Sequence, residues 1–340
     1  MSTAFEALRA RLREHPKTWL VTGVAGFVGS HVLQTLLQDG QHVVGMDNFA
    51  TGKRDNLELV RRAVGDDAFA RLRFLEADIR DRDACQRACQ GVDHIVHEAA
   101  LGSVPRSIAH PMDTHVTNVD GTLNIFLAAL EAGVPRLAYA SSSSVYGDEP
   151  ALPKVEARIG NPLSPYAASK RMDEIYAQVL GRTHGLVAVG LRYFNVVGPR
   201  QDPSGPYAAV VPRWVDALRR GQTPVIFGDG ETSRDFCPVA NVVQATLLAA
   251  STEGDLGGRA YNVALGQRTT LNELYAMLRD GLAARGVDCA GREPRYEDFR
   301  PGDVRHSLAD ITAAQQDLGY APRTDLHTGI ALILDDAVRA

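Results

Sequence analysis

Cysteine is scarce in this sequence of 340 residues, which contains only four. Cys85 and Cys89 lie close together, at a spacing that suits neither a zinc site nor a redox pair. Cys237 and Cys289 stand alone in the sequence. We therefore expect reduced structural thiols and no metal site.

Long apolar runs and an excess of charge of one sign are also missing. The net charge is −5, with both signs spread along the chain, which argues against a nucleic-acid or membrane partner. Near the N-terminus, Phe5, Leu8 and Leu12 recur at helical spacing among charged residues, unlike a signal peptide or a membrane span. We expect a cytoplasmic protein with a short extra helix within residues 4–17.

Short apolar segments alternate with stretches of helical spacing through the first half of the chain. Residues 18–22 (TWLVT) are β-formers that stop at glycines, and residues 27–37 then show helical spacing. Further strands are predicted over residues 42–46, 72–75, 92–97, 136–140 and 187–192. This alternation predicts an α/β protein with a Rossmann-type, doubly wound parallel sheet covered by helices on both faces.

The composition changes at about Gly198 to loops rich in proline and glycine, among them GPRQDPSGPY and FGDGETSRD. Isolated helices are predicted around residues 212–220 and 271–286. We expect residues 196–236 and 267–340 to form a smaller, loop-rich substrate-binding domain. Residues 1–195 would form the cofactor-binding domain, to which residues 237–266 return.

Three glycines follow the first predicted strand at G-x-x-G-x-x-G spacing: Gly23, Gly26 and Gly29. Such glycines let the backbone approach a pyrophosphate at a helix N-terminus, although they also serve ordinary tight turns. The second strand ends in Asp47, whose carboxylate can bind both adenosine ribose hydroxyls and repels a 2′-phosphate. Together they predict a dinucleotide site that prefers NAD to NADP. Asp78 suits the adenine amino group, or equally an N-cap of the next helix.

Tyr166 and Lys170 form a Y-x-x-x-K pair, which a helix places on one face. An adjacent ammonium group lowers the pKa of a phenol, so the tyrosine can act as a base near neutral pH. The pair follows the polar run Ser141 to Ser144, which comes directly after an apolar strand and so lies at the carboxyl edge of the predicted sheet. Each feature alone is ordinary, but with the glycine loop they indicate a catalytic site.

The sequence resembles the extended short-chain dehydrogenase/reductases, specifically the UDP-hexose 4-epimerases. The motifs that carry the resemblance are TGVAGFVGSH, DNFATG, HEAALGSVPRS, NVDGTLN, ASSSSVYGD, SPYAASK, LRYFNVVGPRQ, GDGETSRDF and RPGDVRHSLAD. They cover almost the whole chain in order. The nearest branch is the bacterial one that epimerises UDP-N-acetylglucosamine and its relatives for O-antigen and capsule synthesis, which places the protein in lipopolysaccharide biosynthesis.

The resemblance implies a reversible C4 epimerisation through a 4-keto sugar, with NAD regenerated in every cycle and retained. Tyr166 would take the proton from O4, Lys170 would hold the nicotinamide ribose, and Ser142 would hydrogen-bond O4. The family commonly dimerises through two helices, one of which carries Y-x-x-x-K. We therefore expect a homodimer whose partner molecule is a UDP-sugar.

The resemblance also implies the binding residues. Those expected to bind NAD are Gly23, Gly26, Phe27, Val28, Gly29, Asp47, Asn48, Phe49, Ala50, Thr51, Gly52, Asp78, Ile79, Ala99, Ala100, Asn118, Tyr166, Lys170 and Tyr193. Those expected to bind the UDP-sugar are Gly102, Ser103, Ser142, Ser143, Tyr166, Asn195, Ala209, Val210, Val225, Phe227, Arg234, Arg300, Asp303 and Ser307. The two arginines would grip the diphosphate.

Related 4,6-dehydratases and decarboxylases need an additional carboxylate just after the serine motif. Ser143 and Ser144 occupy those positions here, which favours reduction of the ketone over elimination or loss of carbon dioxide. A UDP-glucose/UDP-galactose 4-epimerase remains an alternative. A non-catalytic NAD-binding sensor is a further one, since a fold does not establish an activity.

The prediction of an N-acetylated substrate rests mainly on Ser307. It lies four residues after Asp303, where epimerases restricted to non-acetylated sugars carry a tyrosine that closes the hexose pocket. Gly102 and Ser103 also replace bulkier residues near the sugar. UDP-N-acetylglucosamine, UDP-N-acetylgalactosamine or their uronic acids are the expected substrates, unless Ser307 is merely a small residue at the end of a loop.

Overall fold

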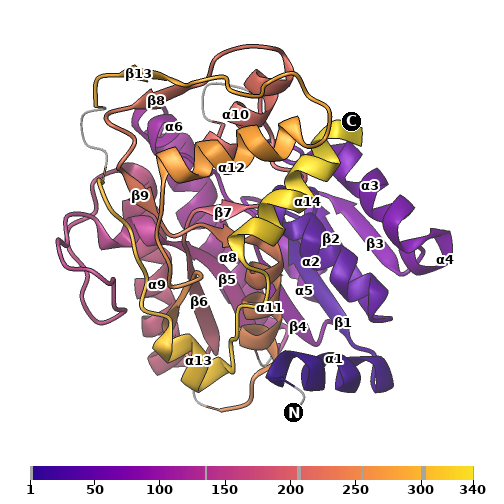
Figure 1. Ribbon diagram of the computed structural model, residues 1–340. Helices are drawn as coiled ribbons and strands as arrows, with labels where there is room; N and C mark the ends of the chain where they lie inside the picture. The colour runs from indigo at the N-terminus through magenta and orange to yellow at the C-terminus, as the bar shows by residue number, and fades with distance from the viewer. Residues whose placement is uncertain (1–2, 135, 205–207, 255, 300–303, 340) are drawn as a thin grey trace.

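A computed structural model describes residues 3–134, 136–204, 208–254, 256–299 and 304–339 (Figure 1). Its centre is a seven-stranded sheet in the order β11-β6-β5-β4-β1-β2-β3, with every neighbouring pair parallel. The strands are β1 (Thr18–Thr22), β2 (His42–Asp47), β3 (Leu72–Glu76), β4 (His94–His97), β5 (Leu137–Ser142), β6 (Ala188–Tyr193) and β11 (Ala260–Val263). The predicted α/β, Rossmann-type parallel sheet is confirmed.

Helices cover both faces of this sheet, because a parallel sheet buries apolar side chains on each side. Trp19 and Val21 of β1 pack in one hydrophobic cluster and Leu20 in another. The first cluster includes side chains of α1 (Ala4–Glu14), α2 (Phe27–Gln38), α3 (Arg54–Val64), α11 (Val239–Ser251) and α13 (Thr312–Leu318). The second includes those of α5 (Arg82–Cys89), α8 (Gly121–Glu131) and α9 (Pro165–His184).

A third hydrophobic cluster lies above the carboxyl edge of the sheet, around α10 (Val210–Arg219), α12 (Leu271–Ala283) and α14 (Leu326–Arg339) (Figure 1). Three two-stranded sheets accompany these helices. They pair β7 (Val196–Val197) with β10 (Cys237–Pro238), β9 (Ser233–Arg234) with β12 (Thr269–Thr270), and β8 (Val225–Phe227) with β13 (Arg295–Glu297).

Short helices complete the connections. They are α4 (Asp66–Phe69), α6 (Val104–Ala109), α7 (Pro111–His115), a π-helical turn (Val116–Asp120) and a 3-10 turn (Ser143–Tyr146). The strand predicted from residue 92 begins two residues later, at His94; Asp93 before it meets Thr18 twice, donating its N–H to the Thr18 carbonyl oxygen and accepting from the Thr18 N–H through its side chain, both at 2.8 Å. No helix in the described ranges is both long and apolar enough to cross a membrane.

Candidate active site

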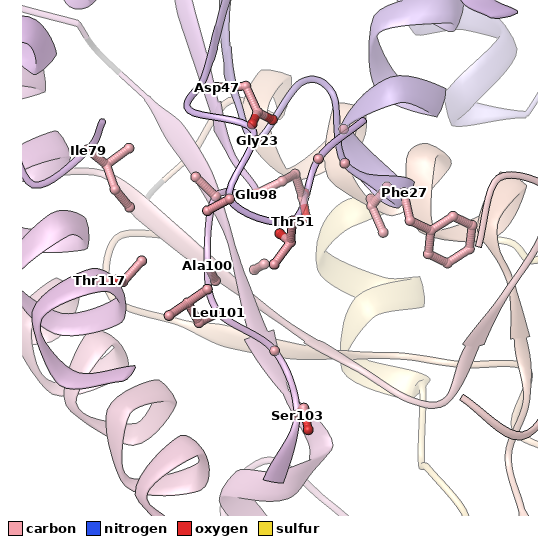
Figure 2. A pocket seen from close by; sticks show the side chains of 18 of the residues that line it. Gly23, Phe27, Asp47, Thr51, Ile79, Glu98, Ala100, Leu101, Ser103 and Thr117 are labelled. Carbon is pink, nitrogen blue, oxygen red and sulfur yellow. The ribbon is translucent and has the colours of Figure 1, made fainter. Parts of the chain in front are cut away.

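A cavity of about 800 Å³ lies at the carboxyl edge of the central sheet (Figure 2). The ends of β1, β2, β4, β5 and β6 all reach it, because parallel strands finish at the same edge. We call it the main cavity. Of the residues predicted to bind NAD or the UDP-sugar, those that line it are Gly23, Gly26, Phe27, Val28, Gly29, Asp47, Asn48, Ala50, Thr51, Gly52, Ile79, Ala99, Ala100, Gly102, Ser103, Ser142, Tyr166, Lys170, Tyr193, Asn195 and Ala209.

The glycine loop between β1 and α2 has no room for side chains. A Cβ atom on Gly29 would lie 2.1 Å from the Gly23 carbonyl oxygen, and one on Gly23 would lie 2.8 Å from the Ala99 nitrogen. Gly23 also has a positive φ of 67°, which disfavours other residues. Gly26 caps α2 without a side-chain hydrogen bond, which leaves N–H groups at the helix N-terminus for an anion.

Asp47 ends β2 with its carboxylate against the glycine loop. One oxygen accepts a hydrogen bond from the Ala25 N–H at 2.9 Å, and the other accepts one from the Phe49 N–H at 2.8 Å. Burial raises the pKa of Asp47, and these backbone hydrogen bonds act in the opposite sense. Since each carboxylate oxygen has two lone pairs, both oxygens can still accept a bond from a ribose hydroxyl.

Ile79 and Arg80, which follow β3, line the main cavity next to Asp47 and β2. Arg80 is also the partner of Asp78: its Nη2 donates to Asp78 Oδ2 at 2.6 Å, and Asn48 Nδ2 donates to the same oxygen at 2.8 Å. The hydrogen bond with Arg80 is the main reason that the pKa of Asp78 falls to about 2. Asp78 itself does not line the cavity, and the N-cap of the next helix is Asp81, whose side chain accepts a hydrogen bond from the Ala84 N–H, so the N-cap role predicted for Asp78 is wrong. Its contact with the adenine amino group stays a prediction.

Tyr166 and Lys170 reach the cavity from the first turns of α9. This helix begins at a favourable N-cap, where the Ser164 hydroxyl accepts a hydrogen bond from the Ala167 N–H at 3.1 Å. The Lys170 side chain is only 3% exposed, and its Nζ lies 3.2 Å from Asp173 Oδ2. The ammonium group is therefore held beside the tyrosine by a carboxylate on the same helix.

Ser142 ends β5, and its Oγ accepts hydrogen bonds from the N–H of Ser144 at 3.1 Å and from its hydroxyl at 3.0 Å. The preceding Ser141 donates to Glu174 Oε1 of α9 at 2.7 Å, and the Arg192 guanidinium of β6 binds both oxygens of Glu174 at 2.8 and 2.9 Å. Burial alone would raise the pKa of Glu174, but the contacts with Arg192, Ser141 and Arg171 together outweigh it and lower the pKa. This buried network fixes α9 to the strand that carries Ser142.

A second cavity of about 170 Å³ meets the main cavity at Asn195, which lines both. Four other expected substrate residues line it: Val210, Val225, Phe227 and Arg234. Arg213 of α10 lines it too, and the sequence had not pointed to that residue. The second cavity therefore combines apolar and aromatic walls with guanidinium groups, which suits a base and a phosphate.

Some expected site residues lie elsewhere. The Phe49 ring packs on Phe74 with ring centroids 5.4 Å apart, and Asn118 Nδ2 donates to Leu101 O and Ser169 Oγ. The expected residues that line neither cavity are Phe49, Asp78, Asn118, Ser143 and Ser307. Arg300 and Asp303 lie outside the described residues.

Ser307 does not line the second cavity but pairs with a strand, β9, that does. Its backbone N–H donates to the Ser233 carbonyl oxygen at 3.0 Å, and the residue after Ser233, Arg234, is in the cavity wall.

Glu98 lines the main cavity although the sequence had not singled it out. It directly follows β4, so the rule that pointed to the serines after β5 could have found it.

Comparisons with known proteins agree with this geometry. The sequence profile of the NAD dependent epimerase/dehydratase family matches residues 19–264. The UDP-glucose 4-epimerase of Mycolicibacterium smegmatis is 40% identical over 314 residues, which are 92% of this chain and 96% of that protein.

Two solved structures share the fold over nearly their whole length. The UDP-N-acetylglucosamine 4-epimerase of Methanobrevibacter ruminantium, in complex with UDP-N-acetylmuramic acid, is 36% identical with a TM-score of 0.87, covering 95% of this chain and 99% of that one. The UDP-glucose 4-epimerase of Thermus thermophilus, in complex with NAD, is 34% identical with a TM-score of 0.81, covering 95% and 99%.

Proposed function

The chain belongs to the NAD dependent epimerase/dehydratase family, and we propose that it inverts C4 of UDP-N-acetylglucosamine and UDP-N-acetylgalactosamine, or of their uronic acids. The relatives of the chain support the more general activity, NAD-dependent 4-epimerisation of a UDP-sugar, without fixing the sugar. The observation that carries the proposal is the meeting of Ser142, Tyr166 and Lys170 with the glycine loop in one cavity.

The residues of the main cavity fit NAD. The glycine loop leaves space for a pyrophosphate at the uncapped N-terminus of α2, and Asp47 retains acceptor capacity for ribose hydroxyls. Bound there, NAD would supply the acceptor for the hydride from C4 of the sugar and the donor for its return to the other face of the C4 ketone.

In the proposed reaction, Tyr166 is the base that removes the O4 proton and later returns it. Lys170 lines the same cavity, and its ammonium group would hold the nicotinamide ribose and place a positive charge on this side of the site. Asp173 keeps the Lys170 side chain in place, at 3.2 Å from its Nζ. Ser142 donates a hydrogen bond to O4, and its position follows from the network that ties β5 to α9.

Elimination or decarboxylation would need a further acid or base near the sugar. Among the described residues, the carboxyl groups that line the main cavity belong to Asp47, Glu98 and Asp113. None of them lies on the segment after β5, where Ser143 and Ser144 stand. Return of the hydride to C4 is therefore the favoured fate of the ketone.

Space around the sugar supports an N-acetylated substrate. A Cβ atom on Gly102, in the wall of the main cavity, would meet no atom within 4 Å, so this loop leaves open volume. Ser307 is small and adjoins the strand that carries Arg234. The M. ruminantium neighbour, which shares this fold, was solved with an N-acetylated UDP-sugar, UDP-N-acetylmuramic acid.

Replacing Ser307 by tyrosine tests the choice of sugar. We expect Ser307→Tyr to abolish turnover of UDP-N-acetylglucosamine and to spare that of UDP-glucose, since added volume excludes the larger substrate first. Val304→Tyr, at a neighbouring exposed position, is the matched control. The measurement is NMR of products from each UDP-sugar and its uronic acid. An unchanged ratio of the two activities in Ser307→Tyr would show that Ser307 is not the gate.

UDP-glucose is the second candidate substrate, since the 40% identical M. smegmatis relative is named for it. The same NMR assay decides between them by their kcat/KM values. We further propose that the protein is a homodimer, for which the exposed apolar face of α9 is the support. A cytoplasmic location is proposed from the sequence alone. A role in lipopolysaccharide biosynthesis rests on the sequence resemblance.

A further inference from the structure

Glu98 is an acidic residue of the main cavity that the proposed chemistry does not use. It follows β4, which lies in the sheet between β1, leading into the glycine loop, and β5, ending in Ser142. Figure 2 shows Glu98 in the wall of the cavity. Its carboxyl group therefore lies between the expected pyrophosphate site and the catalytic residues.

A hydrogen bond fixes this carboxyl group. The Tyr193 hydroxyl donates to Glu98 Oε1 at 2.7 Å, and the same hydroxyl lies 2.9 Å from Thr246 Oγ1. Tyr193 also lines the cavity. Within the described part of the chain, the other carboxyl oxygen of Glu98 makes no hydrogen bond, so it is available to a bound molecule.

Few other charges act on Glu98. The ionisable groups around it are Lys170 of α9, with Asp173 behind it, and Tyr193 of β6. His97 precedes it in the chain, but the His97 ring contacts Thr22 and Thr122. His97 is neutral, because burial lowers its pKa to about 3, and burial raises the pKa of Tyr193 well above its usual value. Desolvation raises the pKa of Glu98 to about 7, while the Tyr193 hydrogen bond and the Lys170 charge oppose this.

We propose that Glu98 is a further residue of the cofactor site, and that its carboxylate faces the nicotinamide and stabilises the positively charged oxidised ring over the neutral reduced ring. The inference rests on the proposed function in one respect, that the nicotinamide lies beside Tyr166 and Lys170. A fixed negative charge near a ring that loses its positive charge on reduction favours the oxidised form. Glu98 thereby keeps the cofactor in the state that can begin a cycle.

The test measures which form of the cofactor the holoprotein retains. Wild type and Glu98→Gln are incubated with equal concentrations of NAD and NADH until exchange is complete, and unbound nucleotide is removed. The protein is then denatured and both forms are quantified. We expect the bound NADH to NAD ratio to rise about tenfold in Glu98→Gln at alkaline pH. Glu98→Asp, which keeps the charge, should restore most of the wild-type ratio.

The pH dependence separates this role from a structural one. In wild type the NADH to NAD ratio should fall from about pH 6 to about pH 8, because the Glu98 carboxylate forms over this range. In Glu98→Gln most of this fall should be lost, and what remains belongs to Asp173, whose pKa burial raises to about 7 behind Lys170. Asp113→Asn is the matched control: Asp113 lines the same cavity near Arg80, and its loss of charge should leave the ratio and its pH dependence as in wild type.

A ratio that is unchanged in Glu98→Gln, or that varies with pH in that variant as in wild type, would overturn the inference. If Glu98→Gln does not fold, the wild-type series decides alone, and a ratio independent of pH refutes the proposal. No sugar is present in this assay. Failure of the epimerase assignment would therefore appear separately, as lack of turnover of any UDP-hexose.

Discussion

Tyr166 is the residue on which the proposed chemistry depends most. Tyr166→Phe removes the phenol and little volume, so we expect a fall in kcat of about 10²-fold or more with bound NAD and UDP-sugar affinity retained. Tyr296→Phe, an exposed tyrosine that lines neither cavity, is the control. The measurements are steady-state kinetics and UDP-sugar binding by calorimetry. A variant that kept more than about a tenth of the rate, a barrier increase under about 1.4 kcal/mol, would require another base.

At the same scale, the sequence predicted best those cavity-lining residues that end a strand or directly follow one. Gly23, Asp47 and Ser142 all lie at strand ends, and the shared carboxyl edge of a parallel sheet brings them to one cavity. Arg213 could not be found in this way, because its place in the second cavity depends on how α10 packs against distant segments. The N-cap role of Asp78 illustrates the same limit, since the cap of α5 is Asp81 and the Asp78 carboxylate pairs with the Arg80 guanidinium instead.

At the scale of elements, α9 has two faces with different tasks. Its buried face carries Lys170 and Glu174 toward β5 and β6, while Met172, Ile175 and Val179 are between 41% and 47% exposed on the other side. Tyr176 is exposed as well. A contiguous apolar stripe on a helix marks an interaction surface, and a second copy of the chain is the occupant that we propose.

We therefore expect the wild-type protein to be a dimer and the double variant Ile175→Glu, Val179→Lys to be a monomer. The new side chains form an i,i+4 pair that supports the helix, so the change acts on the exposed face. Light scattering after gel filtration gives the mass, and bound NAD reports that the fold is retained. Leu332→Glu, an exposed apolar position on α14, should remain dimeric. A monomeric wild type, or a double variant that stays dimeric, would contradict this assignment.

Elements of the first half could be predicted because their strands are apolar and are separated by helical spacing. The strands β7, β9, β10 and β12 have two residues each, too few for a periodic pattern. The π-helical turn Val116–Asp120 also escaped prediction. There the Asn118 side chain accepts a hydrogen bond from the Leu101 N–H at 2.7 Å and donates one to the Leu101 carbonyl oxygen at 3.1 Å. A contact between segments so far apart in the chain produces no periodic pattern in the local sequence.

At the scale of the whole molecule, the site lies where two parts of the chain meet. The sheet supplies the glycine loop, Asp47, Ser142, and through α9 the pair Tyr166 and Lys170. The segments after Asn195 supply the second cavity. Asn195, which follows the last long strand before these segments, lines both cavities. In the proposed reaction, the cofactor would stay in the main cavity and the sugar nucleotide would enter from the second.

The most direct test of the epimerase assignment is NMR of UDP-N-acetylglucosamine incubated with the purified protein and no added NAD. We predict that the C4 epimer, UDP-N-acetylgalactosamine, accumulates to an equilibrium that is also reached from the other side. NAD should be recovered from the denatured protein, and UDP-glucose should react more slowly. If the protein carries NAD but converts none of the UDP-hexoses or their uronic acids, the assignment is contradicted and a non-catalytic NAD-binding protein takes its place.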